Sequence, residues 1–233
     1  MTPVSTAPRF GAGRFAQSVL DLALPAFCAG CGREGEPLCR RCRSPLESRL
    51  RLPPGLALGL PANLPMPLAQ LEWCSPFSGT VRKALHRLKY DGEKRLAAPL
   101  GEALAARWRA AGRGGDLLVP VPVHASRARQ RGYDQAVLLA SAAAPLLGLP
   151  WRRLIERKEA TRPQFELGRK ARWANVGGAF GLAKGVAAPQ LEGAWIVLVD
   201  DVVTTGATLL ACSEALYAAG AVAVSAVTVA RER

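Results

Sequence analysis

One segment of the chain, residues 196–208, gathers two acids, three threonines and a glycine after an apolar run. The run, residues 195–199, has the length and β-branched content of a buried parallel strand, and a helical stretch to residue 219 follows it. A turn that leads from a strand into a helix offers free backbone N–H groups and a positive helix dipole to a phosphate. We therefore predict a phosphate site in this turn. Its candidate residues are Thr204, Thr205, Gly206, Ala207 and Thr208.

Two acids, Asp200 and Asp201, precede this turn and would repel a bare phosphate. Their presence is explained if the ligand is a sugar phosphate, because carboxylates accept hydrogen bonds from ribose hydroxyls. These two acids are the candidate catalytic residues. The alternative is that these residues only cap a helix. Capping needs one polar residue, whereas this segment has six in order, so we favour a ligand site.

A group of basic residues follows another apolar segment, residues 116–123. We predict that this segment is a strand, and that its pairing fails near its end because of Pro120 and Pro122. An Ala/Leu helix is expected over residues 133–147. Basic side chains on a loop before a helix favour a pyrophosphate site, although such loops are often only solvated. The basic or potentially basic residues of this loop are His124, Arg127, Arg129 and Arg131.

Four of the six cysteines follow the pattern C-x2-C-x7-C-x2-C, and they are Cys28, Cys31, Cys39 and Cys42. Two C-x2-C turns that face each other close a tetrahedral Zn²⁺ site with no open position, so the predicted role is structural. Disulfides are the competing interpretation, but no secretory signal is evident and we expect a cytoplasmic, reducing location. In so small a module metal binding and folding are coupled, and loss of the metal is expected to unfold residues 1–47 alone. Cys74 and Cys212 are expected to be ordinary buried thiols.

The length, charge and hydrophobicity of the chain limit which partners and locations it can have. The chain has 233 residues and a formal net charge of +13, which suits a polyphosphate, a nucleic acid or an acidic partner. The alternative is that the excess charge is dispersed over solvated faces. No apolar stretch approaches the roughly 20 residues of a membrane span, and residues 18–27 are expected to form a short docking helix. Candidate stacking platforms for single-stranded DNA are Trp73, Trp151 and Trp173. The basic residues of the second C-x2-C turn, Arg40, Arg41 and Arg43, are candidate contacts to its backbone.

The expected fold class is α/β, with a parallel sheet flanked by helices and a small N-terminal zinc-ribbon-like module. We place the module at residues 1–47, a proline-rich linker at 48–70 and the α/β domain at 71–233. Strands are expected near residues 117–123, 194–199 and 221–230. Amphipathic helices are expected at residues 80–90, with His86 on the surface, and around Leu96, Leu100 and Leu104.

The Asp/Thr segment resembles the signature of type I phosphoribosyltransferases, which bind 5-phosphoribosyl 1-pyrophosphate, and the match has no gap. Further motifs are similar to the ComF (competence protein F, GntX-like) family: Pro120-Val-Pro-Val-His124, Arg129-Gln-Arg-Gly-Tyr-Asp-Gln-Ala136, Arg162-Pro-Gln164 and Asn175-Val-Gly-Gly-Ala-Phe180. With the four cysteines, the resemblance covers nearly the whole chain. It implies a type I phosphoribosyltransferase-like domain, Mg²⁺ bound with the substrate pyrophosphate, and a link to the uptake of transforming DNA. It also implies that residues 156–180 form a mobile loop over the ligand, with Arg162 among the substrate-binding residues.

The acceptor of a phosphoribosyl group cannot be identified from these motifs, and three classes of function stay open. The chain could be an active transferase that releases pyrophosphate. It could bind the phosphoribosyl ligand without turnover. It could instead be a non-catalytic accessory of DNA uptake that contacts single-stranded DNA and a helicase-like competence protein.

Overall fold

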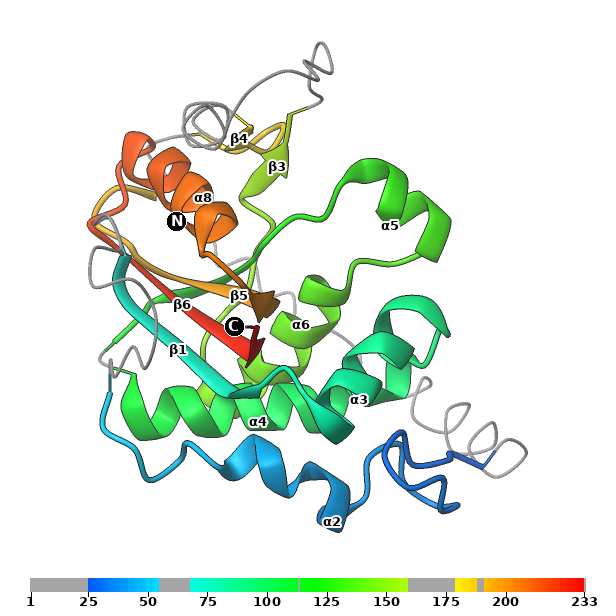
Figure 1. Cartoon of the computed structure of the whole chain (residues 1–233). Helices are drawn as coiled ribbons and strands as arrows, with labels where there is room; N and C mark the ends of the chain where they lie inside the picture. Colours follow the sequence, from blue (N-terminus) through cyan, green and yellow to red (C-terminus); the bar gives the residue numbers. More distant parts are fainter. Residues whose placement is uncertain (1–24, 55–67, 113, 159–178, 188–190, 233) are drawn as a thin grey trace, which may run out of the picture.

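A computed structural model describes residues 25–54, 68–112, 114–158, 179–187 and 191–232. Its centre is a four-stranded sheet in the order β1-β6-β5-β2, and all the neighbouring strands are parallel (Figure 1). The strands are β1 (Leu68–Pro76), β2 (Leu117–Pro120), β5 (Trp195–Val203) and β6 (Ala223–Arg231). The expected parallel sheet is therefore confirmed.

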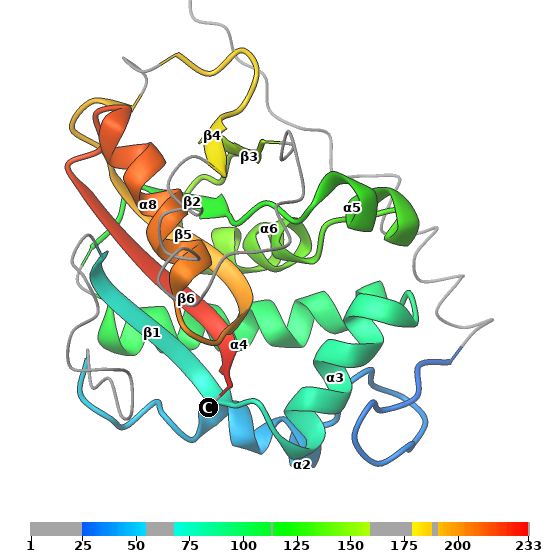
Figure 2. The same cartoon turned by 45° about the horizontal axis from the view of Figure 1, so that its top comes forward.

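Helices cover both faces of this sheet (Figure 2). One face packs against α3, α4 and α6, and the other packs against α8 and a small antiparallel pair, β3 and β4. The bounds of these elements are α3 (Gly79–Tyr90), α4 (Ala97–Ala111), α6 (Gln135–Leu147), α8 (Ala207–Ala218), β3 (Ile155–Arg157) and β4 (Phe180–Leu182). The shorter helices are α2 (Arg40–Arg43), α5 (Ala125–Arg131), and the 3-10 turns Ser44–Glu47 and Lys94–Leu96. No described helix is long and apolar enough to cross a membrane.

Strand β5 lies between two separate hydrophobic cores. Val197 and Val199 belong to the core with α3, α4 and α6, whereas Ile196 and Leu198 belong to the core with α8. All four side chains are fully buried. Successive side chains of a strand point to opposite faces, so a parallel strand covered on both sides must be apolar at every position. This explains the unbroken apolar run before the two acids.

The four-cysteine segment packs directly against α3. Cys28 and Cys42 belong to the same buried core as Val81 and Leu85 of that helix. Thr80 Oγ1 donates a hydrogen bond to the Cys42 carbonyl at 3.0 Å, and the Arg87 guanidinium donates to the Phe27 carbonyl at 3.1 Å. The segment therefore shares its core with the α/β domain, and we no longer expect it to fold or unfold by itself.

A buried ion pair ties the chain that follows the cysteines to the sheet. Arg107 of α4 and Glu72 of β1 are both fully buried, and Arg107 Nε and Nη2 lie 2.9 and 2.5 Å from Glu72 Oε2. The remaining guanidinium N–H groups donate to three backbone carbonyls, those of Arg49, Leu52 and Pro53. A guanidinium presents its donors in a fixed planar fork, so this one side chain holds a loop, a helix and a strand in a single arrangement.

Several sequence expectations need correction. The expected loop at 124–132 is the helix α5, because His124 caps its first turn and Gly132, at φ 73°, ends it. Strand β5 continues through both acids to Val203, and β1, an edge strand bounded by prolines, was not predicted at all.

Other expectations are confirmed: pairing of β2 with β5 ends at Pro120, and Cys74 and Cys212 are buried. Most of the docking helix expected at 18–27 lies outside the described residues, and residues 25–27 are not helical.

Replacing Arg107 by Met is expected to lower the free energy of unfolding by about 3–5 kcal/mol, because the buried Glu72 carboxylate loses the guanidinium that forms its ion pair. Urea unfolding followed by circular dichroism measures the change. Arg109→Met on the same helix is the control, because Arg109 is exposed and donates to one carbonyl, and its effect should stay within about 0.5 kcal/mol. Equal midpoints for the two variants would contradict the assigned role of Arg107.

Candidate functional site

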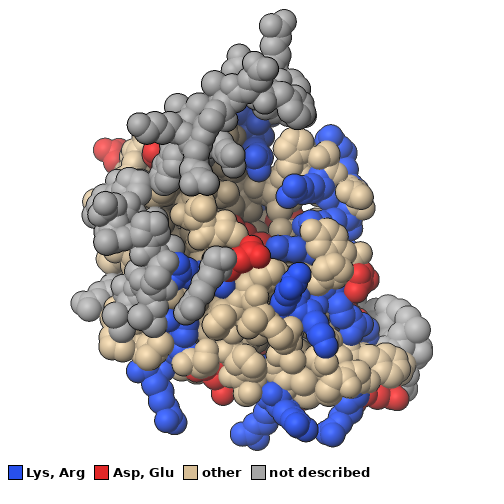
Figure 3. All heavy atoms as spheres, viewed as in Figure 1, with Lys and Arg blue, Asp and Glu red and all other residues tan. Residues whose placement is uncertain are grey.

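The polar residues of interest gather where the strands of the parallel sheet end. The arrowheads of β5 and β6 point toward α3 and α5 (Figure 1). In open α/β sheets this edge is the usual place for a ligand, because loops and helix N-termini converge there. Acidic atoms lie in the middle of the face seen in Figure 3, and basic side chains border them. The edge thus combines both signs of charge within one surface.

The turn between β5 and α8 has the form expected of a phosphate cradle. Gly206 is the N-cap of α8 and adopts a left-handed backbone conformation with φ 83°. Thr205 Oγ1 accepts a long hydrogen bond of 3.4 Å from the Ala207 N–H, whereas Thr204, Thr205 and Thr208 are exposed. The 12 residues of α8 add a helix dipole directed at the turn. Exposed hydroxyls and N–H groups at such a turn can bind an anion.

The two acids point to opposite faces of the sheet, as strand alternation requires. Asp201 follows the parity of Val199, is 4 % exposed, and forms an ion pair with Lys89 of α3. Asp200 follows the parity of Leu198 and is partly buried on the side of α8. Its Oδ1 accepts a hydrogen bond of 2.8 Å from the Asp201 N–H. The two carboxylates therefore occupy different environments although they are neighbours in sequence.

Burial raises the pKa of Asp200 well above its ordinary value, and the nearby Asp201 carboxylate adds to the rise. The Lys89 ammonium opposes this effect on the pKa. A carboxyl group with a raised pKa is poised to change its charge when a ligand or cation arrives.

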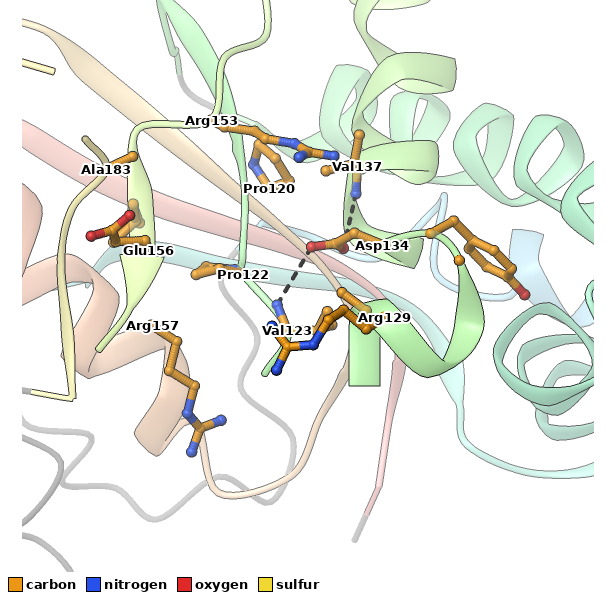
Figure 4. Close-up of a pocket in the computed structure, with 14 residues that line it drawn as sticks. Pro120, Pro122, Val123, Arg129, Asp134, Val137, Arg153, Glu156, Arg157 and Ala183 are labelled. Carbon is orange, nitrogen blue, oxygen red and sulfur yellow. Dashed lines mark hydrogen bonds between the residues drawn. The ribbon is translucent and has the colours of Figure 1, made fainter. Parts of the chain in front are cut away.

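A cavity of about 690 Å³ lies beside α5, between the end of β2 and the β3–β4 pair. Arg129 and Arg157 extend into this space from opposite sides (Figure 4). Asp134 faces the cavity as the N-cap of α6, and it accepts hydrogen bonds from the N–H groups of Ala136 at 2.9 Å and Val137 at 3.4 Å. Burial raises the pKa of Asp134, and its backbone donors oppose the rise. The cavity wall also includes Pro120, Pro122, Arg153, Ile155 and Glu156.

The predicted site residues fall into two groups. Asp200, Asp201 and the turn from Thr204 to Thr208 lie at the end of β5 and do not line the cavity, whereas Arg129 does. Arg162 lies outside the described residues.

The other residues of the basic group have varied roles. Arg127 is exposed on α5, and Arg131 lies 4.9 Å above the Tyr90 ring. The Nδ1 atom of His124 accepts a hydrogen bond of 3.3 Å from the Ser126 N–H, so this imidazole serves as a helix cap.

Sequence reasoning missed five residues of this region: Lys89, Asp134, Arg153, Glu156 and Arg157. Asp134 had a readable signal, because an acid directly before an Ala/Leu run is a typical helix N-cap. The run around Arg153 and Arg157 is basic, which also marks it as a candidate anion-binding segment. No local pattern marks Lys89, because its partner Asp201 is far away in the sequence.

The thiol groups of the four predicted ligands meet at one place. Their sulfur atoms all lie within 4.8 Å of one another, and the Sγ atoms of Cys31 and Cys39 are 3.8 Å apart. A tetrahedral zinc with Zn–S bonds of about 2.3 Å places its sulfurs about 3.8 Å apart. The cluster could therefore hold a metal ion, and its four sulfur donors fit zinc.

The predicted aromatic platform for single-stranded DNA is wrong at Trp73. This side chain is 3 % exposed, and the guanidinium groups of Arg49 and Arg231 lie 3.8 and 5.1 Å from its ring centre. Trp151 is partly buried against the core, and Trp173 lies outside the described residues. His86 is exposed on α3, as expected.

Replacing Gly206 by Ala is expected to lower the free energy of unfolding by about 1–2 kcal/mol, because its left-handed conformation places Cβ against the backbone. Thermal or urea unfolding measures the loss. Gly181→Ala is a suitable control, because a new Cβ there meets only the flexible end of Lys158, and we expect a change within about 0.5 kcal/mol. If both variants were equally stable, the turn would not depend on glycine.

Comparisons with known proteins identify the relatives of this chain. No protein-family model matches it. The DNA utilization protein YhgH of Salmonella typhimurium is 32% identical over 205 residues, which cover 85% of this chain and 86% of the relative. Competence protein F of Haemophilus influenzae is 29% identical over 209 residues, which cover 86% and 88%.

Solved structures give weaker overlaps. They include the glutamine phosphoribosylpyrophosphate amidotransferase from B. subtilis complexed with ADP and GMP, with a TM-score of 0.39, 22% identity and coverage of 57% of this chain and 25% of that one. A purine phosphoribosyltransferase from Pyrococcus horikoshii has a TM-score of 0.37, 16% identity and coverage of 58% and 82%. These overlaps are too distant to transfer residue roles. The extent of the identity to YhgH, with the four-cysteine cluster and the parallel sheet, shows that the chain belongs to the ComF family.

Proposed function

We propose that this chain binds 5-phosphoribosyl 1-pyrophosphate together with Mg²⁺ and acts in the utilization or uptake of DNA. The observation that carries the ligand is the turn from Thr204 to Thr208, which presents hydroxyls and a helix N-terminus directly after Asp200. An arginine-lined cavity lies at the same edge of the sheet. The role in DNA utilization comes from the names of the relatives, DNA utilization protein YhgH and competence protein F.

Each part of the ligand has a complementary group in this proposal. The 5-phosphate accepts hydrogen bonds from the turn at Thr204 to Thr208, and the ribose hydroxyls donate to Asp200. The pyrophosphate extends toward the cavity, where Arg129 and Arg157 supply positive charge. Guanidinium groups suit phosphate oxygens because their planar N–H groups can donate in pairs.

Catalysis at this site would be mainly electrostatic. Loss of pyrophosphate from the anomeric carbon leaves positive charge on the sugar, which the Asp200 carboxylate stabilises. The arginines of the cavity stabilise the negative charge that grows on the leaving group. Bound Mg²⁺ would neutralise part of the pyrophosphate charge, and the oxygen donors of a partly exposed carboxylate and a pyrophosphate are those that this cation prefers. Release of pyrophosphate in the presence of an acceptor would separate a transferase from a protein that only binds the ligand.

Titration calorimetry with Mg²⁺ and 5-phosphoribosyl 1-pyrophosphate is expected to show binding, and Asp200→Asn should weaken it about tenfold by removing one charged hydrogen-bond acceptor. Asp116→Asn is the matched control. Asp116 lies at the opposite end of the sheet, where its Oδ2 accepts a hydrogen bond from the Trp195 N–H at 2.8 Å. The affinity of the Asp116→Asn variant for the ligand should therefore equal that of the wild type. A wild-type protein that gives no binding signal would refute the proposed ligand.

We also propose that Cys28, Cys31, Cys39 and Cys42 hold one structural Zn²⁺. Metal analysis of protein purified without chelators should return one zinc per chain, and Cys39→Ser should lose it. Because the thiols share a core with α3 and α4, the loss should lower the melting temperature of the whole chain. Cys212→Ala, which removes a buried thiol far from the cluster, should keep the zinc. Zinc content that does not depend on Cys39 would contradict this ligand set.

A further inference from the structure

The last turn of α3 carries a cation that points at the candidate site. Lys89 forms an ion pair with Asp201, and the two side chains are only 20% and 6% exposed. Four apolar side chains bury the adjacent face of this helix: Val81, Ala84, Leu85 and Leu88. The burial of that face fixes the rotation of α3 and hence the direction of Lys89. The ion pair is therefore built into the packing of the helix.

The same turn of α3 also contacts the basic half of the site. The hydroxyl of Tyr133, a residue that lines the cavity, donates a hydrogen bond to the Leu88 carbonyl. The Arg131 guanidinium lies 4.9 Å above the ring of Tyr90. Three consecutive residues, Leu88 to Tyr90, thus join the end of β5 to the α5–α6 region. These two regions hold the two groups of predicted site residues.

We propose that Lys89 is a positioning residue for the ligand site. Its ion pair holds the Asp201 carboxylate on the α3 side of β5 and neutralises it, so that the incoming polyanion meets one acid, Asp200, at the sheet edge. This inference rests on the proposed function and names the residue that makes an acid pair compatible with a phosphorylated ligand.

The physical reason is the cost of an unpaired acid beside phosphates. A buried carboxylate without a partner is strongly unfavourable, so it takes up a proton or turns toward water. Here the nearest open side is the carboxyl edge of the sheet, where the ligand binds. An Asp201 carboxylate that turned to this edge would repel the phosphates of the ligand and compete with Asp200 for the turn. Lys89 removes both problems with a single charge.

The test is a set of titrations with 5-phosphoribosyl 1-pyrophosphate and Mg²⁺ on the full chain. Lys89→Met should weaken binding about tenfold, and Lys89→Arg, which keeps the charge, should stay within about threefold of the wild type. The double variant Lys89→Met with Asp201→Asn should recover most of the lost affinity, because it removes the unpaired acid. Lys83→Met on the exposed side of the same helix is the control and should bind normally.

The outcomes separate this inference from the proposed function. No binding by the wild type would refute the proposed ligand. Binding by the wild type with unchanged affinity in Lys89→Met would overturn the role of Lys89 alone. A structural brace would lower the melting temperature of Lys89→Met and leave the affinity of the folded protein intact, which also overturns the inference. If Lys89→Met does not fold, the double variant carries the test, because it has no buried unpaired charge. An affinity of the double variant near that of the wild type supports the inference. A loss of affinity of tenfold or more, on the order of 1.4 kcal/mol, overturns it.

Discussion

The alternation of side chains along β5 is the constraint on which the site depends. The strand is covered on both faces, so its residues divide between two cores until Val199. The same alternation then sends Asp200 and Asp201 to opposite sides of the sheet. Asp200 lies toward α8 and the turn from Thr204 to Thr208, and Asp201 forms an ion pair with Lys89 of α3. Two neighbouring carboxylates thereby acquire different surroundings: Asp201 is paired with Lys89, whereas Asp200 is only partly buried.

The position of α3 depends in turn on the N-terminal segment. Cys28 and Cys42 pack into the core that this helix shares with α4, and Thr80 donates a hydrogen bond to the Cys42 carbonyl. Downstream of the cysteines, the Arg107 guanidinium holds three carbonyls and Glu72 in the interior. A continuous series of packed elements therefore leads from the four-cysteine cluster through α3 to Asp201. In this family member the four-cysteine segment braces the sheet edge and also gathers four thiols that could hold a metal ion.

The electrostatics of the sheet edge suit a ligand with both hydroxyl and phosphate groups. Arg129 and Arg157 line the cavity from different elements, whereas the end of β5 supplies carboxylate oxygens. A bare polyanion would be repelled by an unbalanced acid pair, and a neutral sugar would gain little from the arginines. Lys89 reduces the negative charge at β5 to about one acid. The result is a surface on which carboxylate oxygens and guanidinium groups lie in separate places.

The sequence by itself determined the elements whose signals are local. The apolar run before Asp200, the glycine of the Thr204–Thr208 turn, the cysteine spacing and the amphipathic α3 each predict their structure from neighbouring residues, because propensity, turn chemistry and ligand spacing act over a few positions. Tertiary structure alone decided the rest. It placed β1 at the sheet edge and buried Trp73. It also paired Lys89 with Asp201 and Arg107 with Glu72, since an ion pair between distant residues leaves no periodic trace in the chain and exists only when packing brings the two charges together.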